Sequence, residues 1–264
     1  DISCSASYNT SYSLGDRTRS FLKVQDGCDY GCSYCTIPMA RGQSRNPDIA
    51  SLITEAGKIA GRGVKEVVLT GVNIGDFGKS TGESFAALLS ELVKVQGIER
   101  YRISSIEPNL LTDEIIRMAT VNEKILPHFH IPLQSGSDKI LGLMRRRYTR
   151  EVFKDRVDTI RKLIPFAGIG ADIIVGFPGE SLSDFEDTFT FLDGLPLSYL
   201  HVFTFSERPD TVAEKLPAKV TSAEKKQRSK RLITLSEKKT LDFNKLNIGR
   251  TTNLLFEKSP ADGN

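Results

Sequence analysis

The chain has 264 residues and a mass of 29.2 kDa, with 39% hydrophobic residues, 26% charged residues and a formal net charge of +3. These values suit one large globular domain and exclude a wholly disordered or collagen-like protein. No apolar run approaches the ~20 residues that span a bilayer, and residues 1–10 lack a signal-peptide pattern. We therefore expect a cytoplasmic protein without a membrane partner.

Segments typical of strands and of helices alternate six times along the chain. The expected strands are residues 20–25, 65–70, 100–106, 128–133, 169–175 and 199–205. Helix starts are indicated at Asn46-Pro47-Asp48, at Thr112, and at Ser183 with Glu186, which fit a capping box. Six units fall short of the eight in a closed barrel, so the sequence predicts an α/β fold with a partial (β/α)6 open barrel. Chemistry is expected at the C-terminal ends of the strands.

Three cysteines lie close together in the loop expected after the first strand: Cys28, Cys32 and Cys35, spaced C-x3-C-x2-C. Thiolates are soft ligands that select zinc or iron–sulfur clusters. A structural zinc site needs four ligands, and the fourth would have to be the distant Cys4. Three thiolates suit a [4Fe–4S] cluster in which one iron has no protein ligand. Both interpretations stay open from spacing alone.

This motif, with an aromatic residue before its third cysteine, resembles the radical S-adenosylmethionine (SAM) enzymes. The resemblance implies that Cys28, Cys32 and Cys35 hold a [4Fe–4S] cluster, that SAM chelates its open iron, and that Tyr34 lies near the cofactor. In that family, one electron from the cluster cleaves SAM to a 5′-deoxyadenosyl radical, which abstracts a hydrogen atom. The cofactor carries the hard chemistry and the protein positions it. No catalytic residue beyond the cluster ligands is predicted.

Longer motifs are similar to the methylthiotransferase subgroup of this family. They are residues 21–29, 35–38, 40–42, 69–75, 102–108, 130–137, 144–148, 172–180 and 205–209. Residues 24–27 and 70–78 resemble the branch that acts on N6-threonylcarbamoyladenosine next to the tRNA anticodon. The alternatives are the branches that modify isopentenyladenosine in tRNA or an aspartate of a ribosomal protein.

The resemblance also implies a reaction and a division of the chain. The subgroup inserts sulfur into an adenine C–H bond and methylates it, with two SAM molecules and a second [4Fe–4S] cluster in a preceding domain. Residues 1–16 would be a leader or remnant linker, residues 17–248 the radical SAM domain, and residues 249–264 the start of a truncated RNA-binding β-barrel. The chain is expected to supply the radical-generating core without completing methylthiolation alone. Its expected partners are a tRNA anticodon stem-loop and a reductant protein, and it is expected to be a monomer.

Polar, glycine and aromatic residues near the expected strands are candidates for cofactor binding. They are Gly71, Asn73, Ser105, Glu107, Gln134, Ser135, Arg145, Asp172 and Phe203. Structural alternatives are a tight turn at Gly71, a helix cap at Ser135, a solvated helix end at Arg145 and core packing at Phe203. Asp172 sits in an apolar strand, where a carboxylate is costly unless paired, so a site role and a salt bridge both fit. His128 and His130 are interpreted as core or rim residues rather than as ligands.

A basic segment lies near the C-terminal end. Residues 219–245 hold nine Lys or Arg residues against three acidic ones, and they are predicted to form a loop and a long helix. Phosphate contacts would give RNA affinity that depends on salt, whereas a solvated helix face is the alternative. Together with the zinc alternative, this segment supports one alternative function that is not enzymatic: a non-catalytic, zinc-stabilised RNA-binding module.

Overall fold

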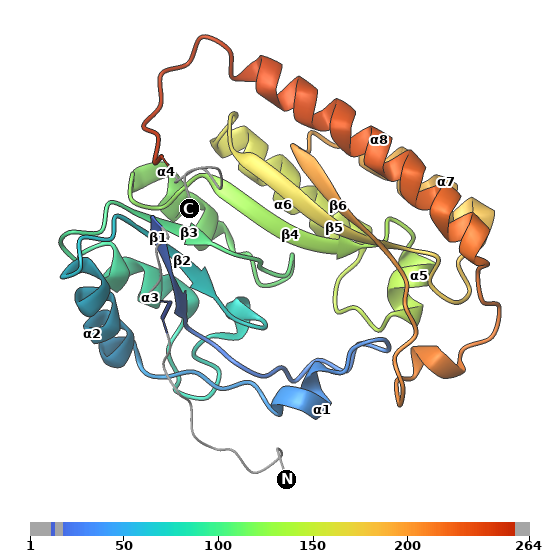
Figure 1. Cartoon of the computed structure of the whole chain (residues 1–264), viewed down its shortest axis with the longest axis horizontal. Coiled ribbons are helices and arrows are strands. Elements are labelled where there is room, and N and C mark those ends of the chain that lie inside the picture. The colour runs from blue at the N-terminus through green and yellow to red at the C-terminus, as the bar shows by residue number, and fades with distance from the viewer. Residues whose placement is uncertain (1–11, 14–17, 257–264) are drawn as a thin grey trace, which may run out of the picture.

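Six strands follow one another along the chain in the computed structural model, which describes residues 12–13 and 18–256 (Figure 1). They are β1 (Arg19–Lys23), β2 (Glu66–Thr70), β3 (Arg100–Ile103), β4 (His128–Gln134), β5 (Gly168–Val175) and β6 (Tyr199–Thr204). Each coincides with a strand expected from the sequence. Runs rich in Val, Ile and aromatic residues, bounded by glycines and polar residues, favour strands because they pack well on a pleated surface.

The strands form two parallel halves, ordered β1-β2-β3 and β4-β5-β6. Isolated parallel bridges join the halves, Tyr101 with Ile125 and Ser105 with His130. The backbone N–H of Ile106 also donates to the carbonyl of His130 at 3.0 Å. Within the described residues β1 and β6 do not pair, so the sheet curves without closing. The partial (β/α)6 barrel predicted from the sequence is confirmed.

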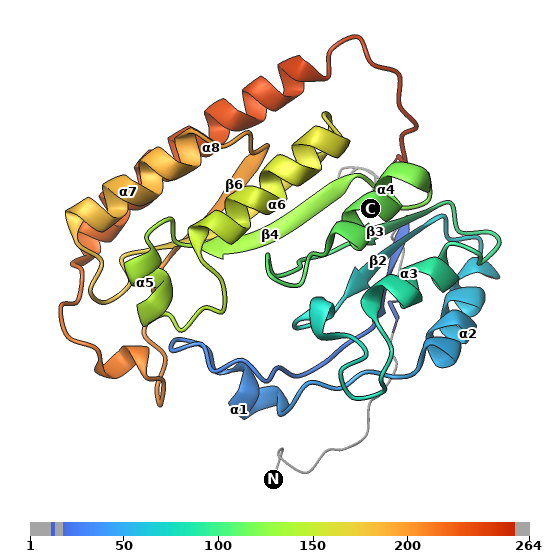
Figure 2. The same cartoon turned by 180° about the vertical axis from the view of Figure 1, so that it is seen from behind.

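Helices cover the outer face of the curved sheet, with α2 and α3 beside the first half and α6, α7 and α8 beside the second (Figures 1 and 2). The helices are α1 (Ile37–Arg41), α2 (Ile49–Ala60), α3 (Phe85–Leu92), α4 (Asp113–Val121), α5 (Asp138–Leu143), α6 (Arg150–Leu163), α7 (Leu182–Asp193) and α8 (Ser222–Leu246). Alternate strand residues such as Leu22, Leu69 and Ile131 are completely buried. Because each such side chain contributes about 1.5–3 kcal/mol, this layer is the main source of stability.

The start of α2 differs from the sequence-based prediction. Asp48 is the capping residue, and its carboxylate accepts a hydrogen bond from the backbone N–H of Ser51 at 2.7 Å. Asn46 lies outside the helix, and its side-chain oxygen accepts from the backbone N–H of Gly78 at 3.0 Å. Asn46 therefore ties two loops together instead of capping a helix.

The capping box of α7 is also shifted from its predicted place. Ser181 and Asp184 form it, two residues before the expected pair of Ser183 and Glu186. An N-cap needs extended backbone, which Ser181 has. Glu186 already lies inside the helix, and its carboxylate pairs with Arg231 on α8. The prediction was wrong because two nearby serines, Ser181 and Ser183, are each followed three residues later by an acid, and Ser183 already lies inside α7.

The concave face of the sheet carries charged side chains, in contrast to its buried outer face. On β2, Oε1 of Glu66 lies 3.9 Å from a guanidinium nitrogen of Arg19 and 3.7 Å from one of Arg102, and Oε2 lies 3.4 Å from one of Arg100. On the other half, histidines of β4 and β6 contact an aspartate of β5. The concave face is therefore suited to a polar ligand.

The last described segment, residues 247–256, follows α8 and returns towards β3. Residues 253–256, within the segment expected to begin a β-barrel, form neither helix nor strand. The carbonyl of Asn253 accepts from Arg100 at 3.4 Å, but in the described part of the chain no strand runs beside this segment to complete a ladder. The boundaries at 16/17 and 248/249 stay predictions, and most of residues 1–16 lies outside the described ranges. Among the described helices, none has the length and apolar character needed to cross a bilayer.

Candidate functional site

The three cysteines lie together in the loop between β1 and α1. All three are half-buried and free of disulfide bonds. The backbone N–H of Tyr30 donates to the sulfur of Cys28, and that of Ile37 donates to the sulfur of Cys35, each at 3.4 Å. Amide groups that point at sulfur stabilise negative charge there. The loop is therefore folded around its three sulfurs, as a thiolate metal site requires.

The base of this loop requires a glycine. Asp26 and Arg45 exchange two backbone hydrogen bonds of 2.9 Å, which closes the loop. Gly27 follows with a φ of +74°, and a Cβ atom there would lie 2.0 Å from the carbonyl oxygen of Gln43. Any larger residue would have to open the loop, because the obstacle is backbone. The position of Cys28 thus depends on the glycine before it.

Gln25 connects the cysteine loop to the loop after β2. Its side chain is completely buried. Its oxygen accepts from the backbone N–H groups of Val72 and Asn73 at 3.0 and 2.8 Å, and its nitrogen donates to the carbonyl of Gly27 at 2.7 Å. A Cβ atom on Gly71 would come within 3.0 Å of that glutamine oxygen. The predicted glycine loop is therefore next to the cysteine loop, joined by a residue that sequence reasoning did not single out.

Arg146 is the second of three consecutive arginines, of which the sequence analysis chose Arg145 as the candidate. Its guanidinium donates to the sulfur of Cys32 at 3.2 Å and to the hydroxyl of Tyr34 at 3.4 Å. It also binds both carboxylate oxygens of Glu107 and donates to the hydroxyl of Tyr148 at 3.0 Å. The Arg146 side chain is only 5% exposed. A buried cation paired in this way holds the predicted residues Tyr34 and Glu107 beside the cysteines.

Burial governs the protonation of this site. It raises the pKa of the Cys28 thiol to about 11. It also raises the pKa of Cys32 and of Glu107, and the positive charge of Arg146 opposes both of these shifts. A bound metal ion deprotonates a coordinating thiol outright. The thiols of Cys28 and Cys32 are therefore protonated at neutral pH unless a metal displaces their protons.

The donor set fits a multi-iron cluster better than a single zinc ion. Ligands of one tetrahedral zinc are about 3–4 Å apart. In the described residues, the one group of three Cys, His, Asp or Glu ligands whose atoms all lie within 4.8 Å is His130, Asp172 and His201. The cysteine sulfurs do not meet that condition, as expected if each binds a different iron. Cys4, the proposed fourth zinc ligand, lies outside the described residues.

Other predicted cofactor residues lie further from the sulfurs. Asn73 donates to the Asp76 carboxylate at 2.9 Å, and its own side-chain oxygen is buried without a partner in the described residues. Gln134 has a left-handed φ of +70° at the end of β4. Ser105 is exposed beside β4, and Phe203 is 52% exposed on β6. Ser105, Gln134 and Phe203 therefore border the concave face, whereas Asn73 belongs to the loop after β2, next to the cysteine loop.

The structure uses two predicted residues elsewhere. The hydroxyl of Ser135 lies 3.3 Å from that of Thr188 on α7 and accepts from the backbone N–H of Ser137 at 3.2 Å. Arg145 is exposed at the end of α5 with a φ of +56°. The neighbouring Arg146 is the arginine that reaches the cysteines. Asp172 contacts two histidines on the concave face.

Comparisons with known proteins agree with this arrangement. A family model described as "Radical SAM superfamily" matches residues 22–192. The chain is 44% identical over 232 residues to a threonylcarbamoyladenosine tRNA methylthiotransferase MtaB of Aquifex aeolicus, covering 88% of this chain and 57% of that protein. It is 36% identical over 241 residues to a tRNA-2-methylthio-N(6)-dimethylallyladenosine synthase of Pelotomaculum thermopropionicum, covering 90% and 54%. The chain thus spans about half the length of these relatives.

A solved structure shares the fold at low sequence identity. The radical S-adenosylmethionine methyltransferase TsrM of Kitasatospora setae, with cobalamin and a [4Fe–4S] cluster bound, matches with a TM-score of 0.62. The match has 17% identity and covers 74% of this chain and 38% of that one. At this identity the match supports the fold alone.

Proposed function

Because the chain belongs to the radical SAM superfamily, we propose that it forms the radical-generating core of a methylthiotransferase that acts on N6-threonylcarbamoyladenosine next to the tRNA anticodon. The observation that carries this proposal is the loop of three free cysteines with hydrogen bonds aimed at their sulfurs. The choice of substrate is supported by similarity. The relative named for threonylcarbamoyladenosine is 44% identical to the chain, and the one named for dimethylallyladenosine is 36% identical.

The chain's own residues have distinct tasks in this proposal. Cys28, Cys32 and Cys35 hold the cluster, which together with SAM supplies one-electron chemistry for removing a hydrogen atom from an unactivated C–H bond. The Arg146 guanidinium and the loop amides donate to the sulfurs, and such hydrogen bonds tune the reduction potential of a cluster. Glu107 fixes the guanidinium by binding it with both oxygens.

SAM would lie between the cysteine loop and the loop after β2. We assign Tyr34, Gly71, Asn73 and Glu107 to this side, because the buried contacts of Gln25 and Arg146 bring them to the cysteines. Ser105, Gln134, Asp172 and Phe203 border the concave face, where the substrate base would enter. Ser135 and Arg145 are not part of the proposed site, since one packs against α7 and the other faces solvent.

The basic helix contributes less to RNA binding than its composition indicates. Most cations of α8 have partners inside the molecule: Arg228 with Glu180, Arg231 with Glu186, and Lys238 with Asp193. Buried Lys239 donates to two backbone carbonyls. These contacts fasten α8 to α7 and the loops around it. The basic segment contains nine cationic residues, but many of them form ion pairs or hydrogen bonds within the molecule.

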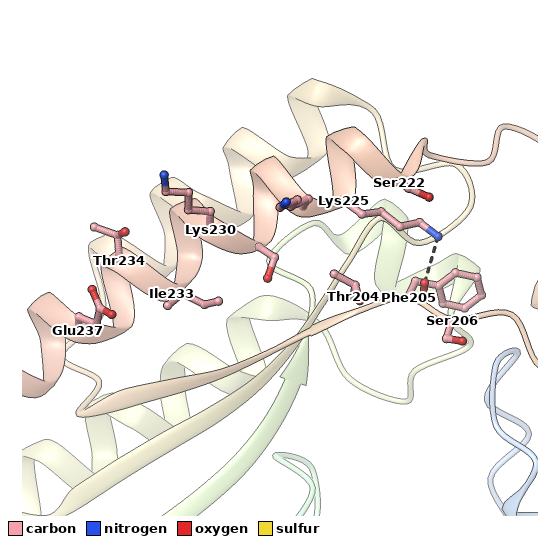
Figure 3. Close-up of a pocket in the computed structure, with 11 residues that line it drawn as sticks. Thr204, Phe205, Ser206, Ser222, Lys225, Lys230, Ile233, Thr234 and Glu237 are labelled. Atoms are coloured by element: carbon pink, nitrogen blue, oxygen red, sulfur yellow. Dashed lines mark hydrogen bonds between the residues drawn. The ribbon is translucent and has the colours of Figure 1, made fainter.

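Three lysines of α8, Lys225, Lys226 and Lys230, line a groove between α8 and the end of β6 (Figure 3). It has a volume of about 810 Å³. Lys225 donates to the carbonyl of Phe205 at 3.0 Å, whereas Lys226 and Lys230 make no ion pair within the described residues. We assign these two lysines to phosphate contacts. Replacing both by alanine should flatten the salt dependence of anticodon stem-loop affinity by about 1.5–2 in log–log slope, and an unchanged slope would remove α8 from the interface.

The first experiment tests radical generation alone. The chain is reconstituted anaerobically with iron and sulfide, reduced with dithionite in the presence of SAM, and assayed for 5′-deoxyadenosine. We expect about four irons and four acid-labile sulfides per chain and product formation that Cys32→Ala abolishes. A folded chain that binds about one zinc, contains no sulfide and forms no product would favour the zinc-stabilised binding module instead.

The second experiment tests the substrate. Binding of the chain to matched anticodon stem-loops is compared, one carrying N6-threonylcarbamoyladenosine, one isopentenyladenosine and one unmodified adenosine. We expect the threonylcarbamoyl form to bind tightest and to raise the yield of 5′-deoxyadenosine. Preference for the isopentenyl form, or for a ribosomal-protein peptide that contains the target aspartate, would assign the chain to the corresponding alternative branch.

A further inference from the structure

A second cluster of metal-ligand residues lies on the concave face, away from the cysteine loop. His130 on β4, Asp172 on β5 and His201 on β6 come from three neighbouring strands. Nε2 of His130 lies 2.8 Å from Oδ1 of Asp172, and Nδ1 of His201 lies 3.3 Å from the same oxygen. One ligand atom from each residue falls within 4.8 Å of the other two.

The register of the parallel strands brings the three residues together. Asp172 pairs with His201 across β5 and β6, and His130 pairs with Gly170, the residue two positions before Asp172 on the same face. Side chains alternate between faces along a strand, so all three project from one side of the sheet. Their meeting is therefore a property of the backbone and does not depend on a flexible loop.

A tyrosine sets the orientation of the His130 ring. The Tyr199 hydroxyl lies 3.1 Å from Nδ1 of His130 and 2.9 Å from Nε2 of His128. A Cβ atom on Gly170 would lie 2.1 Å from the Tyr199 ring, so the glycine makes room for it. This contact on Nδ1 leaves Nε2 aimed at Asp172. Histidines that bind metals are commonly oriented in this way by a partner on the other ring nitrogen.

The cluster is more than the structural salt bridge considered for Asp172. One histidine would suffice to pair the carboxylate, whereas here two rings approach the same oxygen. The His130 side chain is 9% exposed and that of His201 is 55% exposed, so one side of the cluster is anchored and the other is open. Two imidazole nitrogens and a carboxylate oxygen form a donor set that suits divalent zinc and similar transition-metal ions.

We propose that His130, Asp172 and His201 bind one divalent transition-metal ion, with zinc as the ion that fits this donor set. Three protein ligands leave a coordination position open, as in zinc sites that act on a ligand. That position would face the concave side and accept an oxygen donor, such as a carboxylate or phosphate of a molecule bound there. The site requires neither the cysteines nor SAM, so it stands apart from the proposed function.

Cobalt(II) titration tests the site directly, because this ion gives visible absorption bands in a tetrahedral field. The chain carries Cys28→Ser, Cys32→Ser and Cys35→Ser, which removes the thiolate ligands of the cysteine loop. We expect one cobalt per chain, with bands that zinc abolishes by displacement. Asp172→Asn and His201→Ala should each weaken binding at least tenfold. His128→Gln, on the same strand and face, is the matched control and should change affinity less than threefold.

Far-UV circular dichroism and the melting temperature show whether each variant is folded. In the parent, zinc should raise the melting temperature, because an ion that binds the folded state stabilises it. It should not do so in folded Asp172→Asn. Absence of visible bands in the folded parent, or bands that persist in both Asp172→Asn and His201→Ala, would overturn the proposal. Neither result bears on 5′-deoxyadenosine formation, so the two proposals fail separately.

Discussion

Among the residues that the structure describes, the two groups proposed to bind metal are built in opposite ways. The cysteines share one loop after β1, and backbone amides, Gly27 and Gln25 hold that loop in place. The histidines and Asp172 project from three strands, and the sheet itself holds them. In the first group the loop backbone itself is folded around the cysteine side chains. In the second group the side chains project from a sheet whose strand pairing does not depend on them.

This difference explains what each group needs in order to form. A loop site depends on local backbone geometry and on buried partners that prevent it from opening. A site on a sheet depends on register, which packing of the outer face already fixes. We therefore expect single substitutions to damage the cysteine loop more than the strand-borne cluster. The following four predictions test that expectation.

The largest effect is expected from removing a cysteine. Cys28→Ala should abolish formation of 5′-deoxyadenosine, a loss of at least 100-fold, because a cluster with two protein ligands is not retained. Iron and sulfide analysis measures retention independently. Cys4→Ala is the matched control and should leave the iron content unchanged. A loss of metal in Cys4→Ala equal to that in Cys28→Ala would revive the zinc interpretation.

Removal of the buried guanidinium should destabilise the whole fold. Arg146→Ala leaves Glu107 buried without its partner, and breaking such a pair costs about 3–5 kcal/mol. Urea unfolding measures this loss. Arg145→Ala provides the comparison, since the neighbouring side chain is exposed and should change stability by less than ~0.5 kcal/mol. Equal effects of the two substitutions would contradict the role given to Arg146.

Alanine substitutions at two glycines distinguish the cost of steric crowding from the cost of backbone strain. Gly27 and Gly63 have similar φ values of +74° and +80°, but a Cβ atom meets backbone only at Gly27. Gly27→Ala should therefore cost about 2–4 kcal/mol, and Gly63→Ala about 1 kcal/mol. Thermal unfolding of both variants gives the difference. If the two costs are the same, steric crowding at the base of the cysteine loop is not what fixes it.

The second half of the barrel should lose a smaller amount of stability in acid. Burial tends to raise the pKa of Asp184, but hydrogen bonds from Lys139 and Ser181 outweigh it and lower the pKa to about 2. Because the folded pKa lies below the unfolded value of about 3.9, this stability is present above pH ~4 and is lost as the pH falls towards 2. Asp184→Asn should remove about 1–2 kcal/mol at pH 7 and flatten the pH dependence of urea unfolding between pH 4 and 2. A profile as steep as that of the unmodified chain would locate the acid sensitivity elsewhere.

Local patterns were sufficient to predict the strands, whereas the role of the three cysteines as cluster ligands stays a prediction. Short apolar runs, separated by segments with apolar residues at helical spacing, identified the six described strands. The pattern is visible because the side chains buried on the outer face of the sheet must be apolar. Local patterns did not fix the helix starts, since neighbouring serines and acids offer the same pattern in two frames. Ser181 and Asp184 form the box only because the chain is extended at Ser181.

Contacts between distant segments explain what the sequence could not predict. Arg145 and Arg146 are neighbours of the same residue type, so the sequence does not distinguish them. The left-handed turn at the end of α5 decides which one points inward. Gln25 follows a strand, as many polar residues do, but its role depends on a loop almost fifty positions later. The cations of α8 form a basic run in the sequence, yet their partners lie on α7 and the loops beside it.

The opening of the barrel leaves its two outermost strands unequal. Beside β1, the backbone N–H of Ser13 donates to the carbonyl of Phe21 at 3.2 Å, and Tyr12 pairs with Leu22. In the part of the chain that the structure describes, no strand pairs with the outer side of β6. An unpaired strand edge is a template to which a second molecule can add a strand. On this edge Ser236 of α8 accepts from the backbone N–H of Leu200 at 2.8 Å and donates to its carbonyl at 3.0 Å, so the helix that covers β6 also occupies backbone groups that a second strand would use.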